Sequence, residues 1–198
     1  MSPRRKEQVE EIRLKSTQLI VDAALNLFAH QGFYRTTISQ IAKQAGISKG
    51  LIYNYFASKE QLLEAILDQA MHTGDEVLET LQSPEMDPEL ALDQAIDQIF
   101  DLVKANPIYW RLITALSFQE DIISKYKTKL EKHGQDNLTR LTSLLVKMGV
   151  DNPEMEAMYL AASLDGILLH FINFQAHYPI EEMRSFLKIK LRNTQNQT

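Results

Sequence analysis

Residues 36–60 read TTISQIAKQAGISKGLIYNYFASKE, and this stretch decides the fold. Thr37 followed three residues later by Gln40 forms a capping box, which marks the start of a helix. Apolar residues recur after it at helical spacing, and Gly46 stands where the left-handed residue that ends a helix belongs. Ser48 can then cap a second short helix. The stretch therefore predicts two short helices joined by a tight turn, which is a helix-turn-helix.

The second of these helices has an outward side rich in groups that bind nucleic acid. Ile52 and Phe56 are one turn apart and are expected to face inward. The residues left for the outward side are Lys49, Gly50, Leu51, Tyr53, Asn54 and Tyr55. Lysine can reach a phosphate or a guanine edge, and a tyrosine hydroxyl can donate to a phosphate. Because such a helix can lie in the major groove, DNA is the expected ligand of this side.

Helical signals continue through the rest of the chain. Gly32 ends a first helix, and a second capping box at residues 58–61 opens a helix that runs to about residue 81. Three later pairs place a capping side chain before a proline, namely Asp87-Pro88, Asn106-Pro107 and Asn152-Pro153. The helices predicted from these boundaries cover residues 88–105, 107–117, 121–148 and 153–177, with a last one from Pro179. No stretch reads as a strand, so the predicted fold is all-α.

Charge is divided unevenly along the chain. Its 198 residues include 21 Lys and Arg and 26 Asp and Glu, for a formal net charge of −5. Residues 1–60 hold nine bases and five acids, a balance of +4, so the remainder carries −9. A basic head on an acidic body indicates a polyanionic partner for the head alone. We expect two domains, a helix-turn-helix domain over residues 1–58 and a helical body over residues 59–198.

Several classes of function are excluded or disfavoured. The chain has no cysteine, which excludes a thiol nucleophile, a disulfide framework and cysteine-ligated metals. Residues 46–50 match the Gly-x-Ser-x-Gly pattern of hydrolases, but that chemistry needs a strand before the serine. His170 and His177 lie seven residues apart, a spacing that core or interface histidines show more often than metal ligands. We therefore expect no enzyme activity, no metal and no cofactor.

Neither a signal peptide nor a membrane span is predicted. The first 15 residues mix basic side chains with glutamates, and no apolar segment follows them. The most apolar stretch, residues 167–174, is interrupted by His170 and Asn173 and is far shorter than the roughly 20 residues that a span requires. We expect a soluble, cytoplasmic protein.

The run from Gly32 to Glu60 also resembles the DNA-binding head of the TetR (tetracycline-repressor-like) transcription regulators. The matching signature is Thr-x-x-x-Ile-Ala from Thr37, then Ala-Gly-Ile-Ser-Lys-Gly over residues 45–50, then Tyr-x-Tyr-Phe and Ser-Lys-Glu. The close resemblance covers roughly residues 16–65.

This resemblance implies a homodimeric repressor that a small-molecule effector releases from a palindromic operator. It implies a three-helix head, a larger effector-binding body, and a dimer interface formed by the last two helices. The family positions that touch DNA correspond here to Thr37, Ser39, Ser48, Lys49, Gly50, Leu51, Tyr53, Tyr55 and Lys59. Of these, Thr37, Ser48, Tyr53 and Lys59 would mainly contact phosphates, and Lys49, Gly50, Leu51 and Tyr55 would lie nearest the bases.

The body offers candidates for the dimer interface and the effector site. Helix 153–177 is apolar nearly all round, so it must be buried on all sides. One face could pack in its own subunit and the other on a partner chain, and the alternative is a central core helix of a monomer. Apolar and aromatic residues that could line an effector site are Trp110, Ile113, Phe118, Met158 and Tyr159. Ordinary core packing is the alternative for these five. For the whole chain, the alternative is a helical protein-interaction module whose basic head binds an acidic partner.

Overall fold

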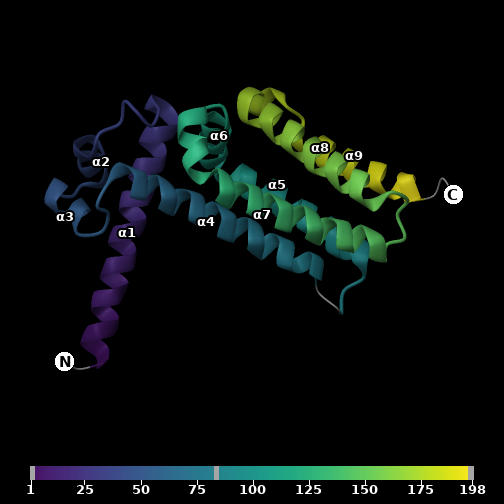
Figure 1. The fold of residues 1–198 in the computed structure, drawn as a ribbon, viewed down its shortest axis with the longest axis horizontal. Coiled ribbons are helices and arrows are strands. Elements are labelled where there is room, and N and C mark those ends of the chain that lie inside the picture. Colours follow the sequence, from purple (N-terminus) through teal and green to yellow (C-terminus); the bar gives the residue numbers. More distant parts are fainter. Residues whose placement is uncertain (1–2, 83–84, 196–198) are drawn as a thin grey trace. The chain divides into compact units, whose positions relative to one another are not determined.

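The computed structural model describes residues 3–82 and 85–195, and every regular element in them is a helix (Figure 1). The α-helices are α1 (Pro3–Gln31), α2 (Ile38–Ala45), α3 (Lys49–Tyr53), α4 (Lys59–Glu79), α5 (Pro88–Ala105), α6 (Pro107–Ser117), α7 (Glu120–Lys147), α8 (Pro153–Phe174) and α9 (Ile180–Gln195). Short 3-10 turns, η1 (Thr80–Gln82) and η2 (Gln175–His177), extend α4 and α8. The all-α prediction is confirmed, and the predicted helix boundaries lie within a few residues of these.

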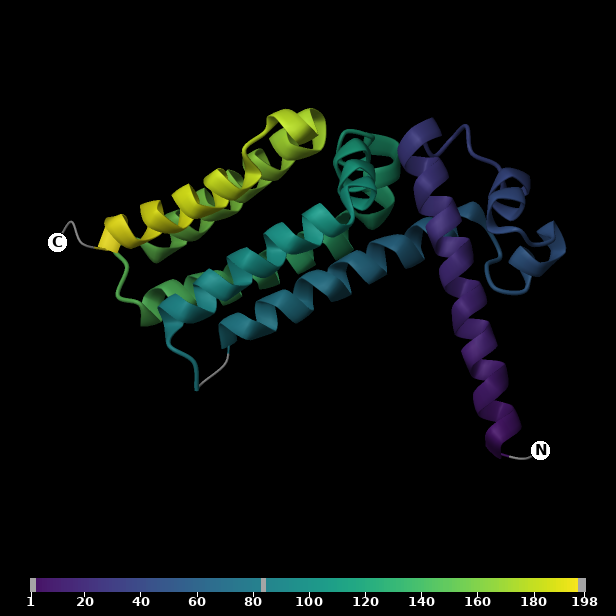
Figure 2. The ribbon, with the colours of Figure 1, turned by 180° about the vertical axis from the view of Figure 1, so that it is seen from behind.

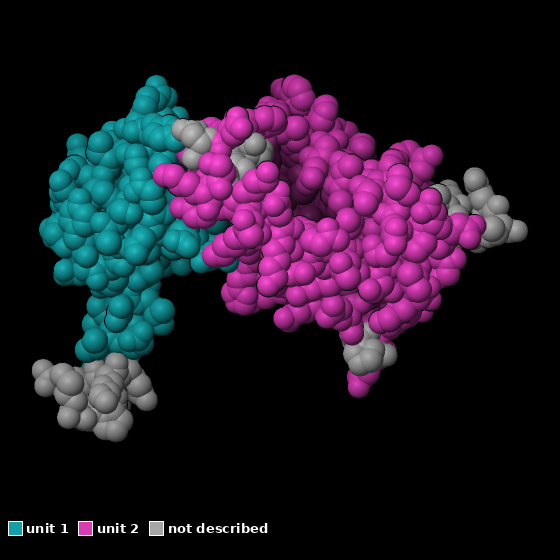
Figure 3. Space-filling view, viewed as in Figure 1, with its two compact units in different colours: residues 1–70 teal, residues 71–198 magenta. Residues whose placement is uncertain are grey.

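The chain forms two compact units, Met1–Ala70 and Met71–Thr198 (Figure 3). Unit 1 contains α1, α2, α3 and the first half of α4. It extends beyond the predicted boundary at residue 58 because Leu62, Leu63 and Ile66 of α4 are buried almost completely. One continuous helix, α4, therefore belongs to both units. The assignment of residues 1–58 and 59–198 to two functional domains stays a prediction.

The caps of α2 and α3 and the glycine turn between them are those that the sequence predicts. The Thr37 hydroxyl accepts from the Gln40 amide at 3.2 Å, and the Gln40 side chain accepts from the Thr37 amide at 2.8 Å. Gly46 ends α2 with φ at 70°, in the left-handed region. Ser48 caps α3 by accepting from the Leu51 amide at 3.1 Å. Both short helices are thus fixed at their ends by the predicted hydrogen bonds.

Two predicted caps differ in detail. At the start of α4, Ser58 accepts from the Gln61 amide, but the Gln61 side chain accepts from the amide of Ala57 and not from that of Ser58. At the start of α8 the expectation of a side-chain cap is wrong. Asn152 makes no such bond there, because it adopts a left-handed conformation with φ at 52°, which asparagine tolerates.

Unit 2 is built around a core of buried apolar residues from the second half of α4, η1, α5, α7, α8 and α9. Phe100 of α5 is completely buried, and Leu145 of α7 and Leu160 of α8 are nearly so. These helices run lengthwise beside one another in both ribbon views (Figures 1 and 2). The α8–η2 segment, Pro153–His177, is also long and apolar enough to cross a membrane by length and composition alone, a test that core helices of globular proteins pass as well. This segment is longer than residues 167–174, the stretch that the sequence showed to be most apolar.

A ladder of ion pairs joins α5 to α9, which both face the reader in Figure 2. Its rungs are Asp93–Arg192, Asp97–Lys188, Asp101–Arg184 and Lys104–Glu181. Partners advance by three or four residues on each helix in opposite directions, so the two helices are antiparallel in a single register. The Lys188 ammonium lies 2.6 Å from the Asp97 carboxylate and its side chain is largely buried. Partly exposed pairs add little stability, so the main effect of the ladder is on register.

The backbone at Gly46 and Gly50 supports a paired prediction. Gly46→Ala should lower the free energy of unfolding by about 1 kcal/mol, because alanine is strained at positive φ. Gly50→Ala should be neutral or stabilising by about 0.5 kcal/mol, because Gly50 is helical and an added Cβ would meet no atom within 4 Å. Urea unfolding of the two variants measures both. Equal destabilisation by the two alanines would contradict the assigned turn.

Candidate nucleic-acid interface

The helix-turn-helix is held by burial on its inner side. Ile41 and Ala42 of α2 and Ile52 of α3 are buried, and α2 packs on α1 while α3 packs on α2. Between the helices, the amide of Ile47 donates to the carbonyl of Ala42 at 3.0 Å. The burial of Ile52 and Phe56 confirms the prediction that they face inward. The remaining side of α3 is left outside the core.

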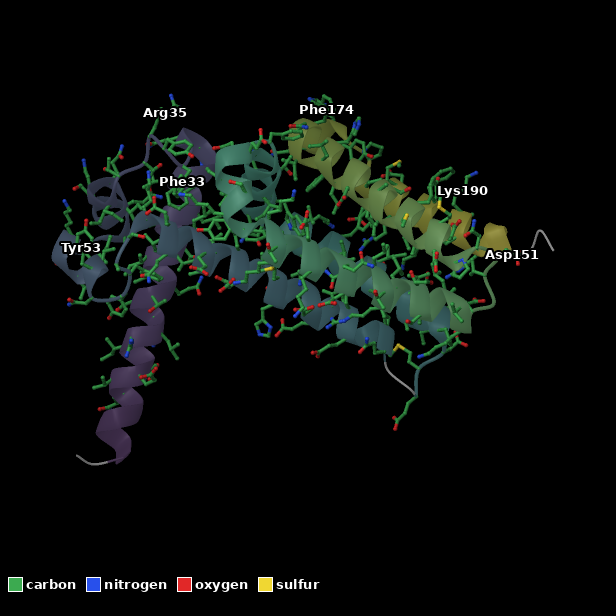
Figure 4. All side chains as sticks on the ribbon, viewed as in Figure 1. Phe33, Arg35, Tyr53, Asp151, Phe174 and Lys190 are labelled. Atoms are coloured by element: carbon green, nitrogen blue, oxygen red, sulfur yellow. The ribbon has the colours of Figure 1, made fainter. Side chains whose placement is uncertain are left out.

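The nine predicted contact residues all lie in unit 1, at the starts of α2, α3 and α4, along α3 and, for Tyr55, just after α3. The exposed ones are Thr37, Ser39, Ser48, Lys49, Gly50 and Tyr53, and the half-buried ones are Leu51, Tyr55 and Lys59. Figure 4 shows Tyr53 pointing away from the unit and Phe33 pointing into it. Six of the nine are therefore accessible to a large ligand, and most of these belong to α3 or to its cap.

The two capping hydroxyls differ in what they can still donate. A hydroxyl has one proton, and Thr37 directs its proton to the Gln40 side-chain oxygen at 2.9 Å. Ser48 only accepts, from the Leu51 amide, and its proton has no acceptor among the described residues. Ser48 can therefore donate to an external oxygen without giving up its cap.

Lysine side chains in unit 1 are of two kinds. Lys49 is exposed, its Nζ lies 6.0 Å from the ring centroid of Tyr53, and it forms no salt bridge within the described residues. Lys43 on α2 is also exposed and has no carboxylate partner in the described ranges. Lys59 is different, since its ammonium donates to backbone carbonyls of unit 1. The basic surface of the helix-turn-helix is thus carried by Lys43 and Lys49.

Between α1 and α3, two exposed cations were not among the predicted site residues. Lys43 lies on α2, and Arg35 lies in the loop before it, where its Nε donates to the carbonyl of Gln31 at 2.8 Å. Figure 4 shows the Arg35 side chain extending outward. The basic excess of residues 1–60 was the signal that could have identified them.

Tyr55 borders a groove within unit 1. The groove has a volume of about 310 Å³ and is open to solvent. It is lined by Val9, Ile12 and Arg13 of α1 together with Asn54 and Tyr55. Tyr55 is thus half-buried beside α1, whereas Lys49 and Tyr53 are exposed.

The predicted effector residues are divided between half-buried and exposed positions in unit 2. Trp110 and Ile113 on α6 are half-buried. Phe118, Met158 and Tyr159 are exposed, at 82%, 49% and 60% of their surfaces, so in a single chain they do not form an enclosed lining. Their role in an effector site stays a prediction.

A polar group that the predicted effector site omits lies next to Trp110. The Tyr109 hydroxyl is buried and has no hydrogen-bond partner among the described residues, and burial raises the pKa of this phenol. Desolvation also raises the pKa of Asp165 on α8, although its side chain stays partly exposed. Figure 3 shows a hollow in the surface of unit 2.

In the described ranges no group of three or more His, Asp or Glu side chains is placed to hold a metal ion.

Comparison with known proteins finds a family match for the segment that contains the helix-turn-helix. Residues 20–66 match the family model for bacterial regulatory proteins of the tetR family. The chain is 34% identical to the transcriptional regulator TtgR of Pseudomonas putida over 102 residues, which is 51% of this chain and 47% of that protein. The chain thus spans about half the length of the first curated relatives that it matches.

Solved structures share the fold along nearly the whole chain. The fatty acid degradation regulator FadR from Bacillus halodurans matches with a TM-score of 0.70 at 20% identity, over 88% of this chain and 93% of its own. A transcriptional regulator from Saccharomonospora viridis in complex with choline matches with a TM-score of 0.68 at 20% identity, over 90% and 96%. The helix-turn-helix thus matches the tetR family of bacterial regulatory proteins over residues 20–66, and the all-helical fold is shared with these solved structures.

Proposed function

We propose that this protein is a sequence-specific DNA-binding transcription regulator, a cytoplasmic repressor that leaves a palindromic operator when a small-molecule effector binds. The observation that carries the proposal is the accessible side of α3. That side combines the unpaired ammonium of Lys49, the free hydroxyl proton of Ser48 and the Tyr53 phenol. These groups can hydrogen-bond to phosphates and to base edges in a major groove.

Charge confines DNA binding to the head. Residues 61–198 carry a balance of −9 and would be repelled by the phosphate backbone, whereas residues 1–60 carry +4. Only the head can therefore approach a duplex closely. Two heads related by a two-fold axis would read a palindrome.

Apolar faces on α8 and α9 support a homodimer through these helices. Met155, Leu169 and Phe174 of α8 are exposed in the single chain, although they belong to a largely apolar helix. Phe186 and Ile189 are exposed on α9. Monomeric proteins rarely leave large apolar patches in water, so a second copy of the chain is the proposed cover. A two-fold interface of this kind uses the same face from each copy.

The body is the proposed site of the effector. Trp110 and Ile113 supply apolar surface on α6, and the buried Tyr109 hydroxyl lacks a partner that a ligand could provide. Sites for small molecules combine apolar walls with a few such polar groups. The choline complex of the Saccharomonospora viridis regulator supports a small organic molecule as the class of effector.

Removal of the Lys49 ammonium should weaken and relax DNA recognition. Lys49→Ala is expected to cost roughly 1–3 kcal/mol of discrimination at one base pair. Lys132→Ala, which removes an exposed and unpaired cation from α7, is the matched control and should leave binding unchanged. Titration of labelled duplexes at several salt concentrations measures both affinity and specificity. If Lys49→Ala bound every duplex like the unmodified protein, the assignment of α3 to the groove would be wrong.

A charge on the exposed face of α9 should prevent dimerisation. Phe186→Glu would place a carboxylate in an apolar interface, where an unpaired charge is strongly unfavourable. Leu90→Glu is the control, because Leu90 of α5 is similarly exposed but lies outside the proposed interface. Light scattering should give a dimer mass for the unmodified protein and for Leu90→Glu, and a monomer mass for Phe186→Glu. A monomer mass for the unmodified protein at micromolar concentration would refute the proposed interface.

Removal of the Tyr109 hydroxyl should stabilise the body in the absence of ligand. Tyr109→Phe is expected to raise the free energy of unfolding by about 1 kcal/mol, since it deletes a buried donor without an acceptor. Tyr159→Phe, at an exposed position of α8, should change the free energy by less than about 0.5 kcal/mol. Urea unfolding of the purified protein tests the pair. A clear loss of stability in Tyr109→Phe would mean that this hydroxyl already has a partner.

A further inference from the structure

We propose that Lys59 is a positioning residue for DNA recognition: its ammonium holds the loop before α2 in place and does not contact a phosphate. The inference rests on the proposed DNA-binding function and departs from the phosphate contact that the family resemblance implies. It concerns only residues of unit 1.

The Lys59 ammonium lies among backbone carbonyls. Its Nζ is 2.8 Å from the carbonyl oxygen of Phe33, 3.1 Å from that of Thr36 and 3.4 Å from that of Tyr34. An ammonium has three protons, and these three carbonyls can accept all of them. The same Nζ lies 4.4 Å from the ring centroid of Phe33, so the ring face adds a cation–π contact. The clasp is this set of contacts between Lys59 and residues 33–36.

The other contacts of the loop that the clasp holds are local ones. It begins at Gly32, whose φ of 84° turns the chain away from α1. Thr36 is almost fully buried, and its hydroxyl donates to the carbonyl of Gly32 at 2.9 Å. The Thr36 amide donates to the carbonyl of Phe33 at 3.3 Å. The Lys59 ammonium adds hydrogen bonds to the carbonyls of Phe33, Tyr34 and Thr36.

The clasp lies directly before α2. The residue after Thr36 is Thr37, the N-cap whose hydrogen bonds with Gln40 set the first turn of α2. α3 packs on α2, so a shift of the 33–36 loop would displace the whole helix-turn-helix. Because Lys59 is the first residue of α4, the clasp also ties the start of α4 to the start of α2.

The contacts of Lys59 leave it little capacity for a phosphate. Any new bond to DNA would have to replace one of the carbonyls. Lys49, by contrast, is exposed and has no hydrogen bond within the described part of the chain. The two lysines should therefore respond differently to the same substitutions.

The test compares methionine and arginine at each position. Lys59→Met removes the charge and the donors, and Lys59→Arg keeps the charge but replaces the compact ammonium with a planar fork. Lys49→Met and Lys49→Arg are the matched controls. Affinity for a duplex selected by the unmodified protein is measured over a salt series, under conditions where urea titration shows each variant to be folded.

For the clasp, we expect Lys59→Met and Lys59→Arg to raise Kd about tenfold each, because both lose charge-assisted hydrogen bonds to the loop. The slope of log K against log salt should stay that of the unmodified protein. Lys49→Met should reduce the magnitude of that slope by about 0.9 for each phosphate that the Lys49 ammonium neutralises, and Lys49→Arg should preserve the slope.

Two binding results would overturn the proposal. Wild-type affinity in Lys59→Arg, together with a reduced slope in Lys59→Met, would show a direct phosphate contact. Reduced stability of both Lys59 variants with unchanged affinity in the folded protein would show that Lys59 only stabilises the fold.

Amide hydrogen exchange of the free protein tests the clasp without DNA. Exchange at the amides of Thr36 and Gln40 should accelerate in Lys59→Met and not in Lys49→Met. Unchanged exchange would refute the clasp even if the protein binds no duplex. Failure of the unmodified protein to select any duplex, with accelerated exchange in Lys59→Met, would instead refute the proposed function alone.

Discussion

The structure depends most on the burial that supports α3, a helix of only five residues. A helix this short cannot be stable by itself in water, because nucleation costs more than its few hydrogen bonds return. It persists because its own Ile52 is completely buried and Ser48 accepts from an amide at its start. With the inner side fixed, Lys49 and Tyr53 project outward on a defined surface. A flexible loop with the same residues would lose the entropy of ordering them whenever it bound DNA.

A second constraint shapes the body. The α5–α9 ladder accepts one antiparallel register, since a shift by one turn would leave a terminal charge without its partner. With this face of α9 turned toward α5, Phe186 and Ile189 lie off that face and remain exposed. The ion pairs between α5 and α9 thereby determine which apolar residues of α9 stay exposed and can contact a partner. The proposed dimer thus depends on the ladder, although each rung contributes little free energy.

Local signals in the sequence predicted most of the fold. Thr37, Gly46 and Ser48 each specify a hydrogen bond or a backbone conformation within a few residues, so no knowledge of distant contacts was needed. The side-chain cap predicted at Asn152 was wrong because asparagine serves both as a cap and as a left-handed residue. The sequence does not distinguish the two roles.

The site was predictable in part. The outward side of α3 follows from helical periodicity, and it appears in the structure as an exposed face. The contacts of Lys59 were not predictable, because they join residues more than twenty positions apart and involve backbone carbonyls that no side-chain pattern records. The unpaired Tyr109 hydroxyl was missed for a similar reason, since only packing reveals whether a phenol finds an acceptor.

The central claim is that the accessible side of α3 reads a DNA sequence. Selection of bound duplexes from a random pool by the purified full chain, at near-physiological salt, tests it most directly. We predict enrichment of one palindrome whose half-sites are separated by about one helical turn. Because a copurified effector could occupy the body, the selection is repeated after the protein is unfolded, dialysed and refolded. A pool that stays random in both selections would contradict the account.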